Sequence, residues 1–227
     1  FGTFNGSLRV TNNTSDQNGG NGFTVPDDPS SFFTGNSADS NAGYGMDIGD
    51  IVNAVISTNT ATNNGLGGIL IGTMNVGQIT GNTTTGNTGI GLEVGAINNG
   101  SMSNNTSTGN TGHGIYTPSI NAGFYDNNVA SQNSGDGISI DTLTFGQLRN
   151  NVTDMNGDDG IFIGTFTGSI IGELDGNSAD ANGEDGFDIG SVGLWNSGNI
   201  TNNNATNNPG FGFNILGTGG GSSTTGN

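Results

Sequence analysis

Acidic side chains recur at matching intervals in the second half of the sequence. Asp136, Asp159 and Asp185 occupy one slot of a repeat described below, and Asp158 and Glu184 immediately precede the last two. If successive repeats stack, the carboxylates should lie about 5 Å apart, where like charges repel unless solvated or bridged by a cation. Calcium accepts several carboxylate oxygens in flexible geometry. The spacing predicts a calcium site made by Asp136, Asp158, Asp159, Glu184 and Asp185, with screened surface charge as the alternative.

The single histidine lies between two glycines, as Gly112, His113 and Gly114. An imidazole close to carboxylates is a common general acid or base in enzymes. Its slot in the repeat, however, holds residues of many types, which indicates an outward turn position and a solvated side chain. The other residues of that slot are Asn21, Tyr44, Gly67, Ile90, Asp136, Asp159, Asp185 and Phe211.

The charge balance excludes several classes of partner. The chain has 19 acidic residues, no lysine, and only Arg9 and Arg149 as basic residues, for a formal net charge of -17. Nucleic acids and anionic membrane surfaces are bound through lysine and arginine, so neither is an expected partner. No apolar run approaches the length of a transmembrane helix, and membrane insertion is not expected. The acidic, Asn- and Thr-rich composition favours an extracellular or cell-surface location.

These residues are carried by a repeat that runs through the whole chain. Two asparagine ladders and one glycine ladder share a common register, in which the step is constant as far as Asn151 and longer for the last two positions. The first ladder is Asn13, Asn36, Asn59, Asn82, Asn105, Asn128, Asn151, Asn177 and Asn203. The second ladder begins at Asn18, and the glycine ladder runs from Gly22 to Gly212. Such recurrence in register is typical of solenoid proteins.

Each repeat contains the pattern of about three short strands. An apolar, any, apolar triplet follows each ladder glycine except Gly114, as in Ile69 and Ile71, and this alternation predicts a strand with one buried face. The residue before each first-ladder asparagine is usually Gly or Asn, the types that tolerate a left-handed corner. We predict an all-β parallel β-helix of nine coils of 23 residues, the last two of 26, about 43 Å long. It spans residues 1–217 as one domain, followed by a Gly/Ser/Thr-rich tail at 218–227.

The two longer coils are expected to bulge on one side of the rod. Their extra residues fall between Ile163 and Leu174 and between Ile189 and Ile200.

The repeat resembles that of the pectate-lyase-like superfamily of right-handed parallel β-helices. The resemblance rests on the pattern I-x-[GN]-N-x-[AST]-x-x-N-x-x-x-G-[ILF]-x-[IV], seen from Ile79 to Val94, and covers roughly Phe4 to Leu216. It implies a right-handed coil, in a fold that hosts polysaccharide lyases, hydrolases, adhesins and inert fibres. The lyases use basic residues at their site, whereas this chain has no lysine and its two arginines lie about six coils apart, too far to share a site. The hydrolases use an Arg and Lys motif that is missing here, and His113 lies two coils from Asp158 and Asp159. The resemblance therefore indicates a non-catalytic member.

Two functions fit such a member. Neither end shows an amphipathic capping helix, and open strand edges invite end-to-end stacking of identical copies. The leading prediction is a structural subunit of an extracellular filament that binds copies of itself head to tail. The alternative is a carbohydrate-binding adhesin or degenerate polysaccharide-active module that binds glycans through Tyr44, Tyr116, Phe166 and Trp195.

A short threonine array is a third surface feature. Paired threonines recur outwards on three neighbouring coils, a flat face that resembles those of ice-binding solenoids, although threonine is also an ordinary strand residue. The array is Thr60, Thr62, Thr83, Thr85, Thr106 and Thr108.

Overall fold

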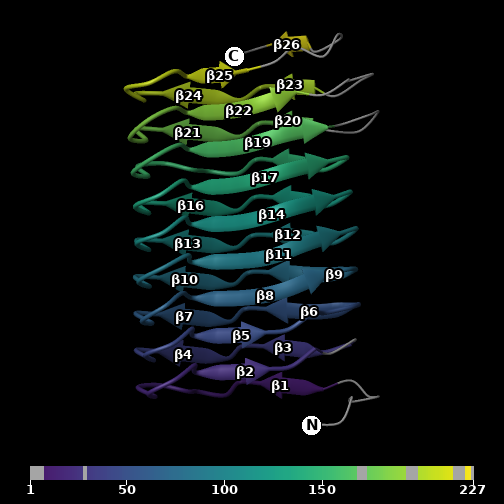
Figure 1. Cartoon of the computed structure of the whole chain (residues 1–227), viewed down its shortest axis with the longest axis vertical. Helices are drawn as coiled ribbons and strands as arrows, with labels where there is room; N and C mark the ends of the chain where they lie inside the picture. Colours follow the sequence, from purple (N-terminus) through teal and green to yellow (C-terminus); the bar gives the residue numbers. More distant parts are fainter. Residues whose placement is uncertain (1–7, 28–29, 168–172, 193–198, 217–222, 226–227) are drawn as a thin grey trace.

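A computed structural model shows a parallel β-helix (Figure 1) and describes residues 8–27, 30–167, 173–192, 199–216 and 223–225. Three parallel sheets, here named A, B and C, run along the rod, and the described residues form no helix. Sheet A comprises β1 (Arg9–Thr11), β3 (Phe32–Thr34), β6 (Ala54–Ser57), β9 (Gly77–Thr80), β12 (Ser101–Ser103), β15 (Phe124–Asp126), β18 (Gln147–Arg149), β20 (Glu173–Asp175), β23 (Asn199–Thr201) and β26 (Ser223–Thr225).

Sheets B and C complete each coil. Sheet B comprises β4 (Ser37–Asp39), β7 (Thr60–Thr62), β10 (Thr83–Thr85), β13 (Thr106–Thr108) and β16 (Val129–Ser131), then β21 (Ser178–Asp180) and β24 (Asn204–Thr206), joined through bridges at Val152. Sheet C comprises β2 (Phe23–Val25), β5 (Met46–Ile48), β8 (Ile69–Met74), β11 (Leu92–Asn98), β14 (Ile115–Asn121), β17 (Ile138–Thr144), β19 (Ile161–Thr167), β22 (Phe187–Val192) and β25 (Phe213–Ile215).

Strand register confirms the predicted period. Strands pair at equivalent positions of the repeat, Arg9 with Phe32 in a shorter coil and Gln147 with Glu173 in a longer one. The nine strands of sheet C mark about eight complete turns with partial coils at the ends, so the predicted number of coils differs only in how the ends are counted. The bulges were predicted between Ile163 and Leu174 and between Ile189 and Ile200, and the central parts of these segments, 168–172 and 193–198, lie outside the described residues.

The asparagine ladders bind successive coils together. In the middle of the rod, the Asn105 side-chain oxygen accepts hydrogen bonds from the backbone and side-chain amides of Asn82, at 3.0 Å each. The Asn105 side-chain amide donates to the Ile79 carbonyl at 2.9 Å and to Asn128 Oδ1 at 3.0 Å. Asn105 is only 1% exposed, so each rung satisfies backbone groups that the corner would otherwise leave buried and unpaired.

The glycine ladder is required by the close approach of the next coil. A Cβ atom on Gly137 would lie 2.6 Å from the Asn156 side-chain nitrogen and 2.7 Å from the Gly160 carbonyl oxygen. Glycine therefore lets the second asparagine ladder reach the backbone at this point.

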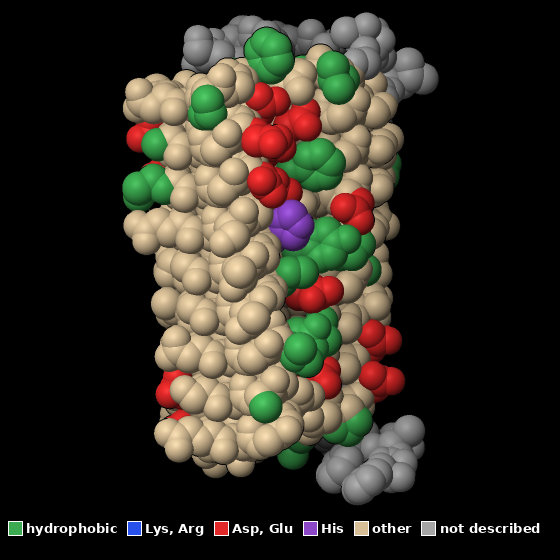
Figure 2. Space-filling view, turned by 60° about the vertical axis from the view of Figure 1, so that its left-hand side comes forward, with side chains coloured by type: hydrophobic (Ala, Val, Ile, Leu, Met, Phe, Trp, Pro, Cys, Tyr) green, Lys and Arg blue, Asp and Glu red, His purple; other side chains and the backbone are tan. Residues whose placement is uncertain are grey.

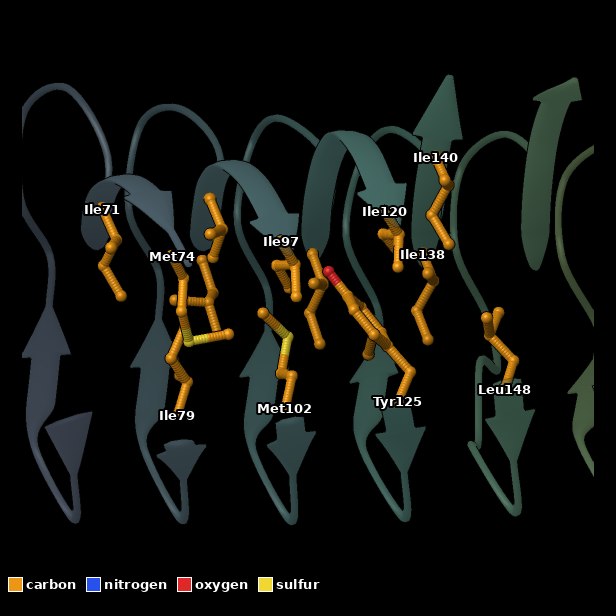
Figure 3. Close-up of a cluster of buried hydrophobic side chains, with 14 of the residues drawn as sticks. Ile71, Met74, Ile79, Ile97, Met102, Ile120, Tyr125, Ile138, Ile140 and Leu148 are labelled. Atoms are coloured by element: carbon orange, nitrogen blue, oxygen red, sulfur yellow. The ribbon is translucent and has the colours of Figure 1, made fainter. Parts of the chain in front are cut away.

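The core is a stack of aliphatic layers, shown for the middle coils in Figure 3. Sheet C contributes two inward columns. After residues such as Ile161 and Ile163, two successive outward residues shift the alternation by one, which turns Phe166 inward. The prediction that Phe166 faces a glycan was therefore wrong, because it is fully buried. The second column is Ile51, Met74, Ile97, Ile120, Leu143, Phe166 and Val192.

One coil carries a buried polar pair in place of two aliphatic residues. Tyr125 in β15 and Thr117 in β14 are both fully buried, and their hydroxyl groups hydrogen-bond across the core. The pairing explains why the apolar triplet is interrupted at Thr117, since the tyrosine hydroxyl needs a partner away from water.

Left-handed residues form the corners, as predicted for the position before the first ladder. There Asn12, Thr58 and Asn104 have φ of 55°, 53° and 56°. A second left-handed corner, which the sequence did not reveal, precedes the second ladder and includes Met155 and Ala181, at 58° and 56°. This conformation is unfavourable for side chains with a Cβ atom, so the repeat fixes the corner even where the residue type opposes it.

The tail extends sheet A. Strand β26, at Ser223–Thr225, pairs in parallel with β23. The division between a domain at 1–217 and a tail at 218–227 stays a prediction.

Candidate functional site

A column of side chains at the corner entering sheet C builds the candidate site. The backbone amide of Asp136 donates to His113 Nδ1 at 3.0 Å. The amide of Asp159 donates to Asp136 Oδ1 at 3.2 Å, and the amide of Asp185 donates to Asp159 Oδ1 at 2.8 Å. Each carboxylate is thus held by the amide of the coil above, and charge-assisted bonds of this kind offset part of the repulsion within the stack.

A shallow groove of about 530 Å³ opens beside this column, across strands β14, β17, β19 and β22. Figure 2 shows the carboxylates gathered above the one histidine of the chain, with hydrophobic side chains beside them. The lining residues are His113, Tyr116, Asp136, Ser139, Asp141, Asp158, Asp159, Phe162, Glu184 and Asp188. Four consecutive coils contribute, so the groove runs along the rod for about 14 Å.

The lower end of the groove is an ordered set of polar groups. The Tyr116 hydroxyl donates to Asp141 Oδ2 at 2.8 Å, and the Tyr116 ring lies 5.8 Å from the His113 ring, centroid to centroid. His113 Nδ1 is also 3.2 Å from Asp136 Oδ2. A neutral His113 ring accepts the Asp136 amide, whereas a protonated ring donates to the Asp136 carboxylate, so the two contacts belong to different protonation states.

His113 is therefore not the freely solvated turn residue that its variable slot predicted. Its side chain is 33% exposed and hydrogen-bonded. The hydrogen bond with Asp136 raises the pKa of His113 above its ordinary value, against the opposing effect of burial. The structure also places His113 in the same groove as Asp158 and Asp159, because the groove extends over the two coils that separate them.

Two carboxylates at the upper end, Asp159 and Asp188, are shielded from water, Asp159 more than Asp188. Burial, with further contributions from the charges of Asp136, Asp188 and Asp185, raises the pKa of Asp159 to about 7, despite the amide bond from Asp185. Burial is also the main reason that the pKa of Asp188 lies above its ordinary value. Oδ1 of Asp188 is buried and accepts no hydrogen bond from the described residues. Such an acceptor is costly to bury, so this end of the groove lacks a donor.

Comparison with known proteins identifies the architecture. The family described as right handed beta helix region matches three overlapping stretches, residues 2–95, 30–172 and 75–227, which together span nearly the whole sequence. The chain belongs to the right-handed β-helix family. The resemblance drawn from the asparagine pattern is thereby confirmed for the fold and its handedness.

A solved structure shares the fold of this β-helix protein. It is the periplasmic alginate epimerase AlgG, determined as a double mutant, with a TM-score of 0.58 and 16% sequence identity. The match covers 86% of this chain and 51% of that protein, so the chain spans about half the length of the epimerase structure. At this identity the likeness shows the fold alone. No match was found among the curated proteins.

The calcium prediction is not tested by the structure of this β-helix protein. Asp136, Asp158, Asp159 and Glu184 all line the groove, and Asp185 continues the column above them. Among the residues that the structure describes, no three His, Asp or Glu side chains form a group that could hold a metal ion. The amide bonds within the column give another reason why these carboxylates can stack, and calcium stays a prediction.

Of the remaining predicted contacts, only Tyr116 lies in the groove among the described residues. Of the aromatic residues, Tyr116 lines the groove, Tyr44 is half-buried below it, and Trp195 lies outside the described residues. The threonine array does form two outward columns on sheet B.

Both arginines are engaged elsewhere. Arg149 forms an ion pair with Glu173 at 2.5 Å on sheet A, and Arg9 lies over the Phe32 ring. The described part of the chain contains no helix that is long and apolar enough to cross a bilayer.

Proposed function

We propose that this β-helix protein is an extracellular or cell-surface glycan-binding module that does not turn over its ligand. The observation that carries the proposal is the groove over coils five to eight, which is lined by carboxylates together with two aromatic side chains, Tyr116 in coil five and Phe162 in coil seven. A linear polysaccharide can lie along such a groove and meet a carboxylate or an aromatic ring in each coil.

The chemistry of the lining suits sugars. Carboxylates accept hydrogen bonds from sugar hydroxyl groups, and aromatic rings pack against the C–H faces of sugar rings. The acceptors are held in place before a ligand arrives, by the column of amide bonds and by the Tyr116–Asp141 hydrogen bond. Preorganisation of this kind reduces the entropy lost on binding.

The same lining argues for binding without elimination or epimerisation. Removing a proton next to a sugar carboxylate requires a cation or hydrogen-bond donors that stabilise the developing negative charge. The two arginines lie elsewhere and the chain has no lysine. The buried carboxylates around Asp159 would instead repel a charged uronate.

A binding panel tests the proposal. Purified protein would be titrated with neutral, acidic and amino polysaccharides by isothermal calorimetry, together with an assay for newly formed reducing ends. We expect at least one glycan to bind without turnover, and the double variant Tyr116→Ala with Phe162→Ala to weaken that binding at least tenfold. Tyr44→Ala, an aromatic deletion outside the groove, is the control and should bind as the parent does. Binding to no glycan, or binding that both variants leave unchanged, would contradict the proposal.

Axial assembly is a second candidate function, favoured by the polarity of the ladders. Asn13 Oδ1 in the first coil accepts no hydrogen bond among the described residues, whereas every later rung accepts from the coil below it. A further copy could donate ladder amides to this end, giving a head-to-tail contact that does not close and so grows into a filament. Negative-stain electron microscopy over a concentration series distinguishes long fibres from discrete rods of about 43 Å.

A further inference from the structure

The groove combines a dense negative charge with a lining in which His113, at the lower end, is the one basic residue. Six of its ten lining residues are Asp or Glu, and none is Arg or Lys. The polysaccharide proposed above must therefore approach a surface that repels anions and favours cations. A neutral glycan would leave that charge unused, and a polyuronate would add to the repulsion.

The carboxylates are also regularly placed along the rod. Asp136 and Asp159 occupy the same slot in successive coils, and Phe162 pairs in register with Asp188 of the coil above. Successive coils lie about 4.8 Å apart, so a polymer lying parallel to the axis meets at least one carboxylate at each step from coil six to coil eight. The charge is thus arranged as a line rather than as a compact cage, which suits a chain of monovalent groups better than one metal ion.

A separate observation points to a missing donor. Asp188 Oδ1 is buried and accepts no hydrogen bond within the described structure, although Asp188 lines the groove. An ammonium group brings three N–H donors and a positive charge. Placed in the groove beside Asp188, it would neutralise the charge of a carboxylate that has no Arg or Lys beside it in the groove.

We infer that the groove binds a linear polysaccharide of amino sugars whose amino groups are free and protonated. This inference rests on the proposed glycan-binding function and specifies the ligand. The ammonium groups lie along the carboxylates of coils six to eight, and Tyr116 and Phe162 pack against the sugar rings. N-acetylation removes the charge and the donors together, so the acetylated form of the same polymer binds weakly or not at all.

The test compares chemically matched glycans. Glucosamine oligosaccharides, their N-acetylated equivalents, oligogalacturonate and polylysine would each be titrated calorimetrically into the full chain. A pH of about 6 keeps amines protonated and carboxylates of ordinary pKa ionised, whereas Asp159, with a pKa of about 7, is largely protonated there. We expect the free-amine glycan to bind at least tenfold more tightly than the acetylated one, and oligogalacturonate not to bind.

Paired variants separate the groove from the general negative charge. The groove variant combines Asp141→Asn, Glu184→Gln and Asp188→Asn. The control combines Asp16→Asn, Asp27→Asn and Asp50→Asn, three exposed residues outside the groove whose oxygens accept backbone amides, as asparagine also can. Both variants lose three negative charges. We expect about tenfold weaker binding in the groove variant and little change in the control, with circular dichroism confirming that both fold.

The outcomes separate this inference from the function on which it rests. Equal loss in both variants, or polylysine binding that shows the same dependence on the groove, would overturn it, because net or local charge alone would then explain the binding. Tighter binding of an acetylated or neutral glycan in the groove would overturn the inference and leave the glycan-binding function standing. If no glycan binds, both fail.

Discussion

At the scale of single residues, the side chains of the corner column serve the fold and the groove together. Asp136 and Asp159 each accept the amide of the next coil through one oxygen and present a charge to the groove. A carboxylate is not required for the first role, because an asparagine oxygen accepts the same bond. The energetic cost of the charge therefore points to a role in binding rather than in folding.

Asp159 provides the sharpest test of that cost. Its pKa is about 7 in the fold against an ordinary value of 3.8, so the fold disfavours the ionised form. The contribution of Asp159 to stability is highest at a pH where its carboxyl group is protonated in both the folded and the unfolded state. It declines as the pH rises from about 4 to about 7, and stays low above that.

We therefore expect Asp159→Asn to raise Tm at about pH 8 and to leave it nearly unchanged at about pH 3. Each kcal/mol of relieved charge burial should raise Tm by roughly 2–4 °C in a chain of this size. Scanning calorimetry at the two pH values measures the difference, with Asp16→Asn as an exposed control. If Asp159→Asn instead had a lower Tm than the parent at about pH 8, the charge itself would stabilise the fold.

Met155 tests the cost of a left-handed corner. Its φ is 58° and its side chain is 53% exposed, so the residue holds an unfavourable conformation without gaining core packing. Asparagine tolerates this conformation and already occupies the same slot as Asn63 and Asn207. Met155→Asn should stabilise the protein by about 1 kcal/mol in urea unfolding, whereas Met155→Ala should give no gain. Equal effects of the two changes would mean that the corner is not strained.

At the scale of elements, we expect the loss in unfolding free energy caused by an Asn→Ala change in the ladder to depend on where along the rod that asparagine lies. Asn105→Ala removes bonds to Asn82, Ile79 and Asn128 in a dry environment and should cost about 3 kcal/mol or more. Asn13 is exposed and lies at one end, so Asn13→Ala should cost less than about 1 kcal/mol. Urea unfolding of both variants gives the comparison, and similar costs would contradict a ladder that works by burial.

The polar pair between β14 and β15 predicts a compensating double change. Thr117→Val should destabilise the protein by about 1–3 kcal/mol, because the Tyr125 hydroxyl loses its buried partner. Adding Tyr125→Phe should recover much of that loss, since no orphan hydroxyl then remains. A double-mutant cycle in urea measures the coupling. Strictly additive effects would indicate that the two hydroxyl groups do not depend on each other.

At the scale of the whole molecule, the sequence predicted the architecture because each coil repeats the same steric demands. Three features recur in register: asparagine at the corners, glycine where the next coil approaches closely, as at Gly137, and alternating apolar residues on the strands. The inward turn of Phe166 escaped prediction, since strict alternation places it outside and only two successive outward residues, Gly164 and Thr165, reverse it.

Only part of the groove could be predicted from the sequence. The acidic stack at Asp136, Asp159 and Asp185 could be read from the repeat, because residues in one slot must lie one coil apart. Tyr116 was named as a glycan contact, but its place beside this stack, like that of Asp188, could not be predicted, since outward positions carry no pattern of their own. His113 was assigned to solvent for the same reason, although its ring is partly buried between neighbouring coils.

His113 offers the most direct test of the central claim that the groove binds a glycan, because it is the only histidine of the chain and lines the groove. Its imidazole signals in a ¹H–¹⁵N NMR spectrum would be followed while glucosamine oligosaccharide is added at constant pH. We predict a saturable shift whose midpoint matches the calorimetric Kd, and its loss in the Tyr116→Ala with Phe162→Ala variant. Calorimetric binding that leaves the His113 signals unmoved would place the ligand elsewhere on the rod and contradict the account.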